Sequence, residues 1–211
     1  MDMGQNKMRP ACWVSLFLVL FFLAGCGGSK SWKAWTDSGF AVEKDGQVIY
    51  CVVDSFDKGF YDIDELTGMA VEEVALFNGK NRSGEGTPAS VEEVAAIEGS
   101  DGLVRVVYRF DKPDTYGAFL GESLFYGSLE EAVAEKLIFE GEVLMNGSET
   151  IVLDEKNRTR FSGNHVIVTS SKTMIRPPYD VLWYCDGVEI LEDESVNAGN
   201  CKDTVVLLLK K

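Results

Sequence analysis

The sequence has few of the residues on which common catalytic and metal-binding motifs depend. It contains one histidine, five cysteines and five prolines among 211 residues. It has no C-x-x-C pair, H-E-x-x-H helix, G-x-S-x-G turn, phosphate-binding loop or dinucleotide glycine fingerprint. Zinc binding, thioredoxin-type redox chemistry and nucleotide-dependent catalysis therefore lack support. An enzyme of another kind stays open.

Basic residues are also scarce. Lys and Arg number 20 against 34 Asp and Glu, which gives a net charge of −14. A surface this acidic repels the phosphates of nucleic acids and of anionic lipid headgroups. The composition therefore argues against a nucleic-acid partner and permits, without implying, calcium or a basic partner.

Long hydrophobic runs are absent except for one near the N-terminus. The run from Ala11 to Gly25 spans 15 residues, whereas a membrane-spanning helix needs about 20. Lys7 and Arg9 precede the run and the small residues Ala24 and Gly25 end it, which is the layout of a secretory signal. An uncleaved membrane helix and an ordinary signal peptide are the alternatives.

The residues Leu23-Ala24-Gly25-Cys26 resemble the lipobox of bacterial lipoproteins. The resemblance implies that diacylglycerol is attached to the Cys26 sulfur and that cleavage leaves Cys26 as the mature N-terminus. Two acyl chains hold a protein on a membrane stably, whereas one chain binds marginally. Gly and Ser follow Cys26, as in flexible tethers. We therefore expect a signal peptide over 1–25, a lipidated tether over 26–36 and a single extracytoplasmic domain over 37–211.

Three cysteines remain after this assignment, so at least one is unpaired within the chain. Cys51 lies in an apolar run and is expected to be a small buried hydrophobe. Cys185 and Cys201 flank a segment rich in turn residues. They could close a disulfide in an oxidising exterior or stay reduced.

The hydrophobic pattern predicts an α+β domain with a mostly antiparallel sheet. Asp45-Gly46 and Asp186-Gly187 each predict a β-hairpin, because Asp-Gly readily adopts positive φ angles. The segment 90–97 is compatible with a strand or a helix, and the strand is favoured. The expected strands are 40–44, 47–53, 90–97, 103–110, 142–145, 150–153, 165–169, 181–185, 188–191 and 204–209.

One main amphipathic helix is predicted to follow Asp62, which can cap it with Glu65 three residues on. Its apolar positions recur at helical spacing, and Asn78-Gly79 predicts its end. A helical turn is expected over 113–120, with Tyr116 and Phe119 pointing inward. A short helix is expected over 129–136, with Ser128 and Glu131 as a second capping box. These helices are expected to pack on the sheet.

The stretch 54–65 matches part of a 12-residue calcium loop. Its third and fifth positions lack carboxylates, and the segment before it favours a strand rather than the entering helix of such a motif. A strand, a loop and a capped helix account for the same acidic residues. The matching residues are Asp54, Gly59, Asp62 and Glu65, at positions one, six, nine and twelve.

Histidine and aromatic residues supply the other candidate sites. His165 has no motif-defined partner and is expected at a surface or on an edge strand, with a metal or catalytic role as the alternative. Trp32 and Trp35 could lie at the lipid headgroups or pack on the domain, and packing is favoured. Four aromatic residues bracket glycines and could line a ligand groove or belong to the core. These are Tyr116, Phe119, Phe125 and Tyr126.

Several stretches, taken together with the lipobox, resemble small lipoproteins of clostridia and related gut Firmicutes. They are 54–57, 61–66, 124–127 and 181–184. The resemblance implies anchoring on the outer face of the cell membrane and assigns no activity, cofactor or site residue.

We therefore expect an extracytoplasmic lipoprotein that contacts the membrane through Cys26 and acts as a binding or interaction module. No catalytic, cofactor-binding or metal-binding residue is assigned. A cell-surface hydrolase and a calcium-stabilised surface module are the alternatives.

Overall fold

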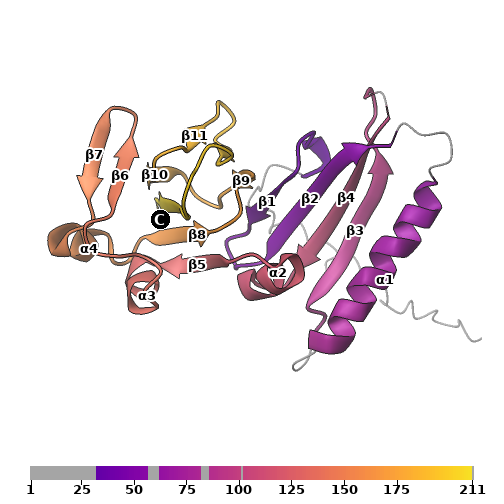
Figure 1. Ribbon diagram of the computed structural model, residues 1–211, viewed down its shortest axis with the longest axis horizontal. Coiled ribbons are helices and arrows are strands. Elements are labelled where there is room, and N and C mark those ends of the chain that lie inside the picture. The colour runs from indigo at the N-terminus through magenta and orange to yellow at the C-terminus, as the bar shows by residue number, and fades with distance from the viewer. Residues whose placement is uncertain (1–31, 57–61, 82–85, 101, 211) are drawn as a thin grey trace, which may run out of the picture.

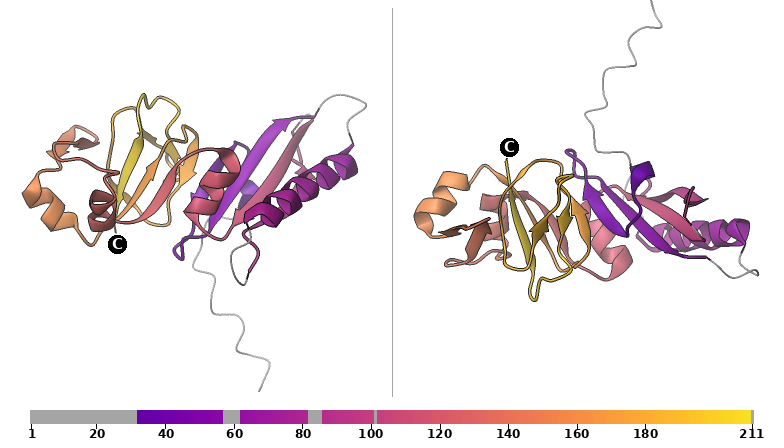
Figure 2. Two further views of the ribbon diagram at one scale, coloured as in Figure 1. Left: turned by 60° about the horizontal axis from the view of Figure 1, so that its bottom comes forward. Right: turned by 90° about the horizontal axis from the view of Figure 1, so that it is seen from above.

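A computed structural model describes residues 32–56, 62–81, 86–100 and 102–210. These ranges contain four α-helices, one short 3-10 helix and thirteen strands in two mostly antiparallel sheets. The predicted α+β class is confirmed. The expected signal peptide and Cys26 lie outside the described residues. The two sheets lie side by side along the long axis of the molecule, with α2 (Pro113–Leu120) near their junction (Figures 1 and 2).

The seven-stranded sheet has the order β11-β12-β9-β1-β2-β4-β3. Its only parallel neighbours among the described strands are β1 and β9, so a late segment of the chain lies beside the first strand. The strands β3 and β4 confirm the strand interpretation of the ambiguous segment. The bounds are β1 (Gly39–Val42), β2 (Val48–Ser55), β3 (Ala89–Ala96), β4 (Leu103–Phe110), β9 (Met174–Arg176), β11 (Glu189–Ile190) and β12 (Val196–Asn197).

The six-stranded sheet has the order β5-β8-β13-β10-β6-β7. Every residue of β13 is buried, as expected for an interior strand. The bounds are β5 (Leu124–Ser128), β6 (Val143–Asn146), β7 (Glu149–Val152), β8 (His165–Thr169), β10 (Val181–Tyr184) and β13 (Val205–Leu209).

The predicted hairpin around Asp186-Gly187 is wrong. β10 pairs with β13 and β6, whereas β11 pairs with β12 in the other sheet. Burial of the aliphatic strand β13 against β10 outweighs the local turn preference, and the turn instead carries the chain from one sheet to the other. The hairpin around Asp45-Gly46 is confirmed by the antiparallel pairing of β1 and β2.

The main helix is α1 (Ile63–Asn81), which lies along β3 (Figure 1). Its capping by Asp62 is confirmed, because Asp62 Oδ1 accepts the backbone N–H of Asp64 at 2.7 Å and of Glu65 at 3.4 Å. Its predicted end at Asn78-Gly79 is wrong, since the helix continues to Asn81. The Asn78 side chain instead donates to the C=O of Ala89 and accepts its N–H at the start of β3. Its amide group is therefore hydrogen-bonded while the backbone continues as a helix.

The short helices follow their capping residues. The capping box before α3 (Leu129–Ala134) is confirmed, because Ser128 Oγ accepts the Glu131 N–H and Glu131 Oε2 accepts the Ser128 N–H. The helix ends two residues earlier than predicted. A further helix, α4 (Glu155–Phe161), was not predicted, although Asp154 caps it by accepting the Asn157 N–H at 2.8 Å.

The hydrophobic core is continuous between the two sheets. Tyr116 of α2 packs with ring centroids 5.1 Å from Phe40 and 5.7 Å from Phe110, and the same cluster includes Ile167 and Leu207 of the other sheet. A second cluster lies between the six-stranded sheet, α3 and α4. A third lies on the opposite face of the seven-stranded sheet and contains Trp35, Ala41, Ile49, Cys51 and Val107. This third cluster forms the base of the candidate site.

Candidate functional site

The segment before β1 is fastened to the third core cluster. Trp32–Ala34 forms the 3-10 helix, and Trp35 is 4% exposed against Ile49 and Cys51. The packing interpretation of Trp35 is therefore confirmed. The folded part of the chain includes Trp32–Trp35, which the sequence interpretation had placed in the tether.

Arg105 of β4 holds this segment in place. Its Nη1 donates to the carbonyl oxygens of Lys33 at 2.9 Å and of Trp35 at 3.3 Å. Its Nε and Nη2 donate to Glu93 Oε2 on β3 at 3.0 Å and 2.6 Å. The Arg105 side chain is 9% exposed and that of Glu93 is 26% exposed. A largely buried ion pair thus fixes the backbone that positions Trp35.

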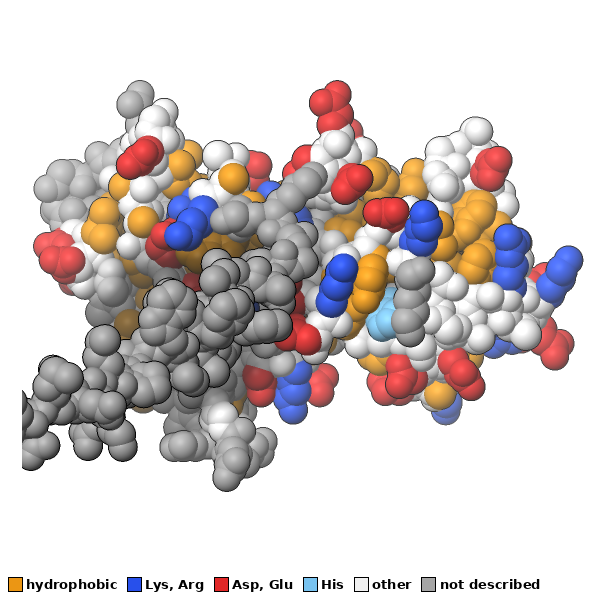
Figure 3. Space-filling view, turned by 180° about the vertical axis from the view of Figure 1, so that it is seen from behind, with side chains coloured by type: hydrophobic (Ala, Val, Ile, Leu, Met, Phe, Trp, Pro, Cys, Tyr) orange, Lys and Arg blue, Asp and Glu red, His pale blue; other side chains and the backbone are white. Residues whose placement is uncertain are grey.

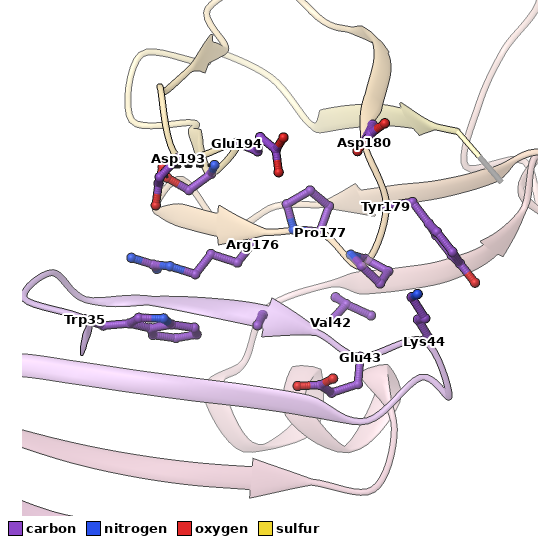
Figure 4. A pocket seen from close by; sticks show the side chains of 13 residues that line it. Trp35, Val42, Glu43, Lys44, Arg176, Pro177, Tyr179, Asp180, Asp193 and Glu194 are labelled. Carbon is purple, nitrogen blue, oxygen red and sulfur yellow. Dashed lines mark hydrogen bonds between the residues drawn. The ribbon is translucent and has the colours of Figure 1, made fainter. Parts of the chain in front are cut away.

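Beside Trp35 lies a pocket of about 270 Å³ that three chain segments form together (Figure 4). The end of β1 and its turn supply residues 41–44. The end of β9 and the following segment supply 176–180, and the turn between β11 and β12 supplies 193–195. We call this hollow the Trp35–Arg176 pocket. Its residues lie far apart in sequence and meet because β9 pairs with β1 and β12 pairs with β9.

The guanidinium of Arg176 lies over the Trp35 ring, with its Cζ 3.9 Å from the ring centroid (Figure 4). The parallel pairing of β9 with β1 sets Arg176 opposite Ala41, on the face that carries Trp35. Stacking of this kind is a cation–π contact, worth about 0.5–2 kcal/mol. Burial lowers the pKa of Arg176 below its usual value, while the nearby carboxylates of Asp193 and Asp37 favour its charged form.

Two hydrogen-bond donors in this stack have no acceptor. Arg176 Nη1 and Trp35 Nε1 are both enclosed and make no hydrogen bond with any described residue. A buried donor without a partner costs about 1–3 kcal/mol. Both side chains line the pocket. A shift of the Arg176 side chain toward the hollow would let an acceptor oxygen there bind Nη1 and recover part of this cost.

The rest of the pocket wall is mainly acidic. Asp193 Oδ1 accepts the backbone N–H of Ser195 at 3.1 Å and also its hydroxyl, which shapes the turn. Glu194 has a backbone φ of 67°, which residues other than Gly rarely adopt. Asp180 stands at the other end of the pocket (Figure 4). The cations Lys44 and Arg176 are therefore outnumbered by the four carboxylates of Glu43, Asp180, Asp193 and Glu194.

His165 lies outside this pocket, in a ladder of aromatic rings next to it. Its ring is 5.1 Å from Tyr126 and 5.6 Å from Tyr179, and Lys44 Nζ lies 5.3 Å from the Tyr179 centroid. The expected edge-strand position is wrong, because β8 lies between β5 and β13. His165 is half-buried and reaches the surface, where it is the pale blue side chain of Figure 3.

The four bracketing aromatic residues do not form a groove of their own. Tyr116 and Phe119 belong to the first core cluster, and Phe125 packs against the second. Tyr126 belongs to the first cluster and stacks on His165. The core interpretation is therefore the one that holds for this set.

The matching positions of the calcium loop come together only in part. Asp54, Asp62 and Glu65 border a second hollow, of about 600 Å³, between α1 and the strands β2 and β4. Asp62 Oδ1 caps α1, and Asp54 Oδ1 accepts the Ser55 N–H. Gly59 lies outside the described residues. Within the described ranges no group of three His, Cys, Asp or Glu side chains is arranged to hold a metal ion. Calcium binding stays a hypothesis.

Comparisons with known proteins add no function. No family model matches the chain, and neither curated proteins nor solved structures give a match. The resemblance to clostridial lipoproteins stays an expectation from the sequence. In the described part of the chain, no helix is both long enough and apolar enough to cross a membrane. The Trp35–Arg176 pocket is the site that the sequence did not indicate, since no motif spacing joins its two main residues.

Proposed function

We propose that the protein is a membrane-anchored extracytoplasmic lipoprotein that binds a small carboxylate-bearing ligand in the Trp35–Arg176 pocket. The observation that carries the proposal is a pair of buried donors, Arg176 Nη1 and Trp35 Nε1. They find no acceptor among the described residues and belong to side chains that line a hollow of about 270 Å³. A carboxylate supplies two acceptor oxygens, and arginine binds this group in a planar, charge-assisted geometry. Trp35 stacks on the guanidinium and holds its plane.

The acidic wall narrows the class of ligand. Glu194, Asp193 and Asp180 repel a ligand with several negative charges, and the chain as a whole carries −14. A ligand with one carboxylate and one positive group can pair its carboxylate with Arg176 and its positive group with the acidic side chains. The chemistry is therefore that of a zwitterion, such as an amino acid or a short peptide with free ends.

The anchor would hold the pocket near the membrane. Trp35 follows Cys26 by nine residues, and a fully extended chain of that length spans at most about 30 Å. A protein lipidated at Cys26 thus keeps this wall of the pocket within about 30 Å of the bilayer surface. Such a position suits capture of a small molecule close to the membrane.

Ligand binding is tested by calorimetric titration of the full-length protein in detergent. The probes are alanyl-alanine, its C-terminal amide and its N-acetyl derivative. We expect saturable binding of the free dipeptide, weaker binding of the acetyl form and the largest loss with the amide. Arg176→Gln should weaken dipeptide binding by about tenfold or more, because a charge-assisted hydrogen bond contributes about 1.5–3 kcal/mol.

The matched control for this titration is Arg109→Gln. Arg109 lies on β4 and pairs with Glu92 at 3.2 Å, away from the pocket. Its replacement should leave dipeptide affinity unchanged. Equal affinity of both variants and the wild type for alanyl-alanine, or no binding of alanyl-alanine, would refute the proposed ligand class.

The anchor is tested separately with Cys26→Ala in cells supplied with labelled palmitate. We expect the wild type to carry the label and to occur in the membrane fraction. The variant should carry no label and should not be processed to a mature lipoprotein. Membrane retention of the variant, together with an unlabelled wild type, would mean that the apolar run 11–25 is an uncleaved helix.

A further inference from the structure

Two cysteines lie at the two ends of the chain segment that carries residues 193–195 of the pocket wall. Cys185 directly follows β10, and Cys201 is 5% exposed in the first core cluster, against which Cys185 packs. Both cysteines lie at this one cluster, and each thiol affects the pKa of the other. The Cys185 sulfur also accepts the Val206 N–H at 3.3 Å. Both thiols are free in this structure.

The backbone segments that carry the two cysteines are also close to each other. A Cβ placed on Gly187 would lie 2.7 Å from the Asn200 carbonyl oxygen and 2.8 Å from Cys201 Cα. The Cys185 N–H donates to the Val206 carbonyl and the Cys201 N–H to that of Ala198, which fixes both ends. A disulfide requires adjacent backbones, and Gly187, two residues after Cys185, lies directly against the backbone of Cys201.

The chain between these cysteines contains part of the candidate site. It runs through β11, the turn 193–195 and β12, and this turn forms one wall of the Trp35–Arg176 pocket. The segment is held by its own hairpin, by the short pairing of β12 with β9, and by Val196 and Ala198, which are buried in the first core cluster. A bond at its base would restrict the whole loop without altering the pocket lining.

We infer that Cys185 and Cys201 form an intramolecular disulfide that closes the 185–201 loop and stabilises the turn lining the pocket. The bond forms by exchange with an external disulfide, R–S–S–R′, of an oxidising compartment. The inference uses the extracytoplasmic location of the proposed function but does not depend on any ligand.

The exchange takes two steps. Cys185, the more exposed of the two, loses its proton to solvent, and its thiolate attacks one sulfur of R–S–S–R′. The S–S bond breaks and R′–S⁻ leaves and takes up a proton. Cys201 then loses its proton and attacks the Cys185 sulfur, and R–S⁻ leaves as the second thiol. The two cysteines are oxidised by two electrons, and the external disulfide is reduced to two thiols.

Burial slows the attack by the protein thiols. It raises the pKa of Cys185, and it raises that of Cys201 to about 12. Only a small share of either thiol is ionised near neutral pH, so slow oxidation is expected in the absence of a catalyst.

Mapping by mass spectrometry tests the bond directly. The full-length protein in detergent is incubated with glutathione disulfide, alkylated and digested without reduction. No Lys or Arg lies between the two cysteines, so trypsin would leave them on one peptide. Cleavage after Glu189, Glu192 and Glu194 separates them. We expect two peptides that stay joined until a reductant is added.

Variants identify the partners. Cys185→Ser and Cys201→Ser should each abolish the joined peptides. The control Cys51→Ser removes a buried thiol of the third core cluster and should retain them. Oxidation should raise the Tm of the wild type and of Cys51→Ser by about 6–12 °C, because closing a loop of about 15 residues contributes about 3 kcal/mol. Glutathione adducts without joined peptides, a joined pair that includes Cys51, or an unchanged Tm would overturn the inference.

Discussion

Replacement of Arg105 by Met tests how the chain positions Trp35. The substitution keeps an unbranched side chain about as long as the aliphatic stem of arginine and removes the guanidinium. Four hydrogen bonds are lost, two to Glu93 and two to the carbonyl oxygens of Lys33 and Trp35. The carboxylate of Glu93 is then left without its partner next to an apolar side chain.

The expected loss of stability follows from burial. Breaking a buried ion pair by removal of one partner costs about 3–5 kcal/mol. The Glu93 side chain is 26% exposed, so water recovers part of its solvation. We therefore expect a loss of about 3 kcal/mol, which for a chain of this size lowers Tm by about 6–12 °C.

The matched control is Arg109→Met on the same strand. Arg109 is 35% exposed and pairs with Glu92, which is 28% exposed, so its removal should cost at most about 1 kcal/mol. Calorimetric melting compares the two variants, and tryptophan emission reports whether Trp35 becomes exposed. The double variant Glu93→Met/Arg105→Met should recover part of the loss. Equal Tm values for the two Arg variants, with unchanged emission, would refute the reasoning.

Two further predictions concern a buried thiol and a crowded turn. Burial raises the pKa of Cys51 to about 11 from 9.0. Because the raised pKa belongs to the folded state, its stabilisation is complete below about pH 9 and is lost as the pH rises through about 11. It amounts to about 2–3 kcal/mol. Melting temperatures recorded from neutral to alkaline pH should fall less for Cys51→Ala than for the wild type, and parallel curves would contradict this. Gly187→Ala should destabilise more than Gly46→Ala by about 1–3 kcal/mol in urea unfolding. Both glycines have a φ near 90°, but only at Gly187 would the new Cβ meet backbone atoms. Equal losses would show that Gly187 does not rest on Cys201.

Features with local causes could be predicted from the sequence. The Asp45-Gly46 turn, the strand over 103–110 and the caps at Asp62 and Ser128 each depend on residues a few positions apart. Their energetics are those of one turn, one helix end or one alternating pattern. The missed helix α4 belongs to the same class, because the cap at Asp154 was visible in the sequence.

Features that depend on strand partners could not be predicted in this way. An alternating pattern shows that a segment is a strand and which face is buried, but it does not name the neighbouring strand. The sequence therefore predicted a hairpin of β10 and β11, although β10 pairs with β13 and β11 pairs with β12 in a separate sheet. The parallel pairing of β1 with β9 was missed for the same reason, and with it the contact between Trp35 and Arg176.

The position of the pocket follows from how the two faces of the seven-stranded sheet are covered. One face packs against α1 and α2, whereas the opposite face buries Ile49, Cys51 and Val107 under Trp35. No α-helix of the described residues contributes to the cluster on that face. The segment leading into β1 covers it instead, and Arg105 holds that segment in place. The same segment is the wall of the pocket nearest to the expected lipid anchor.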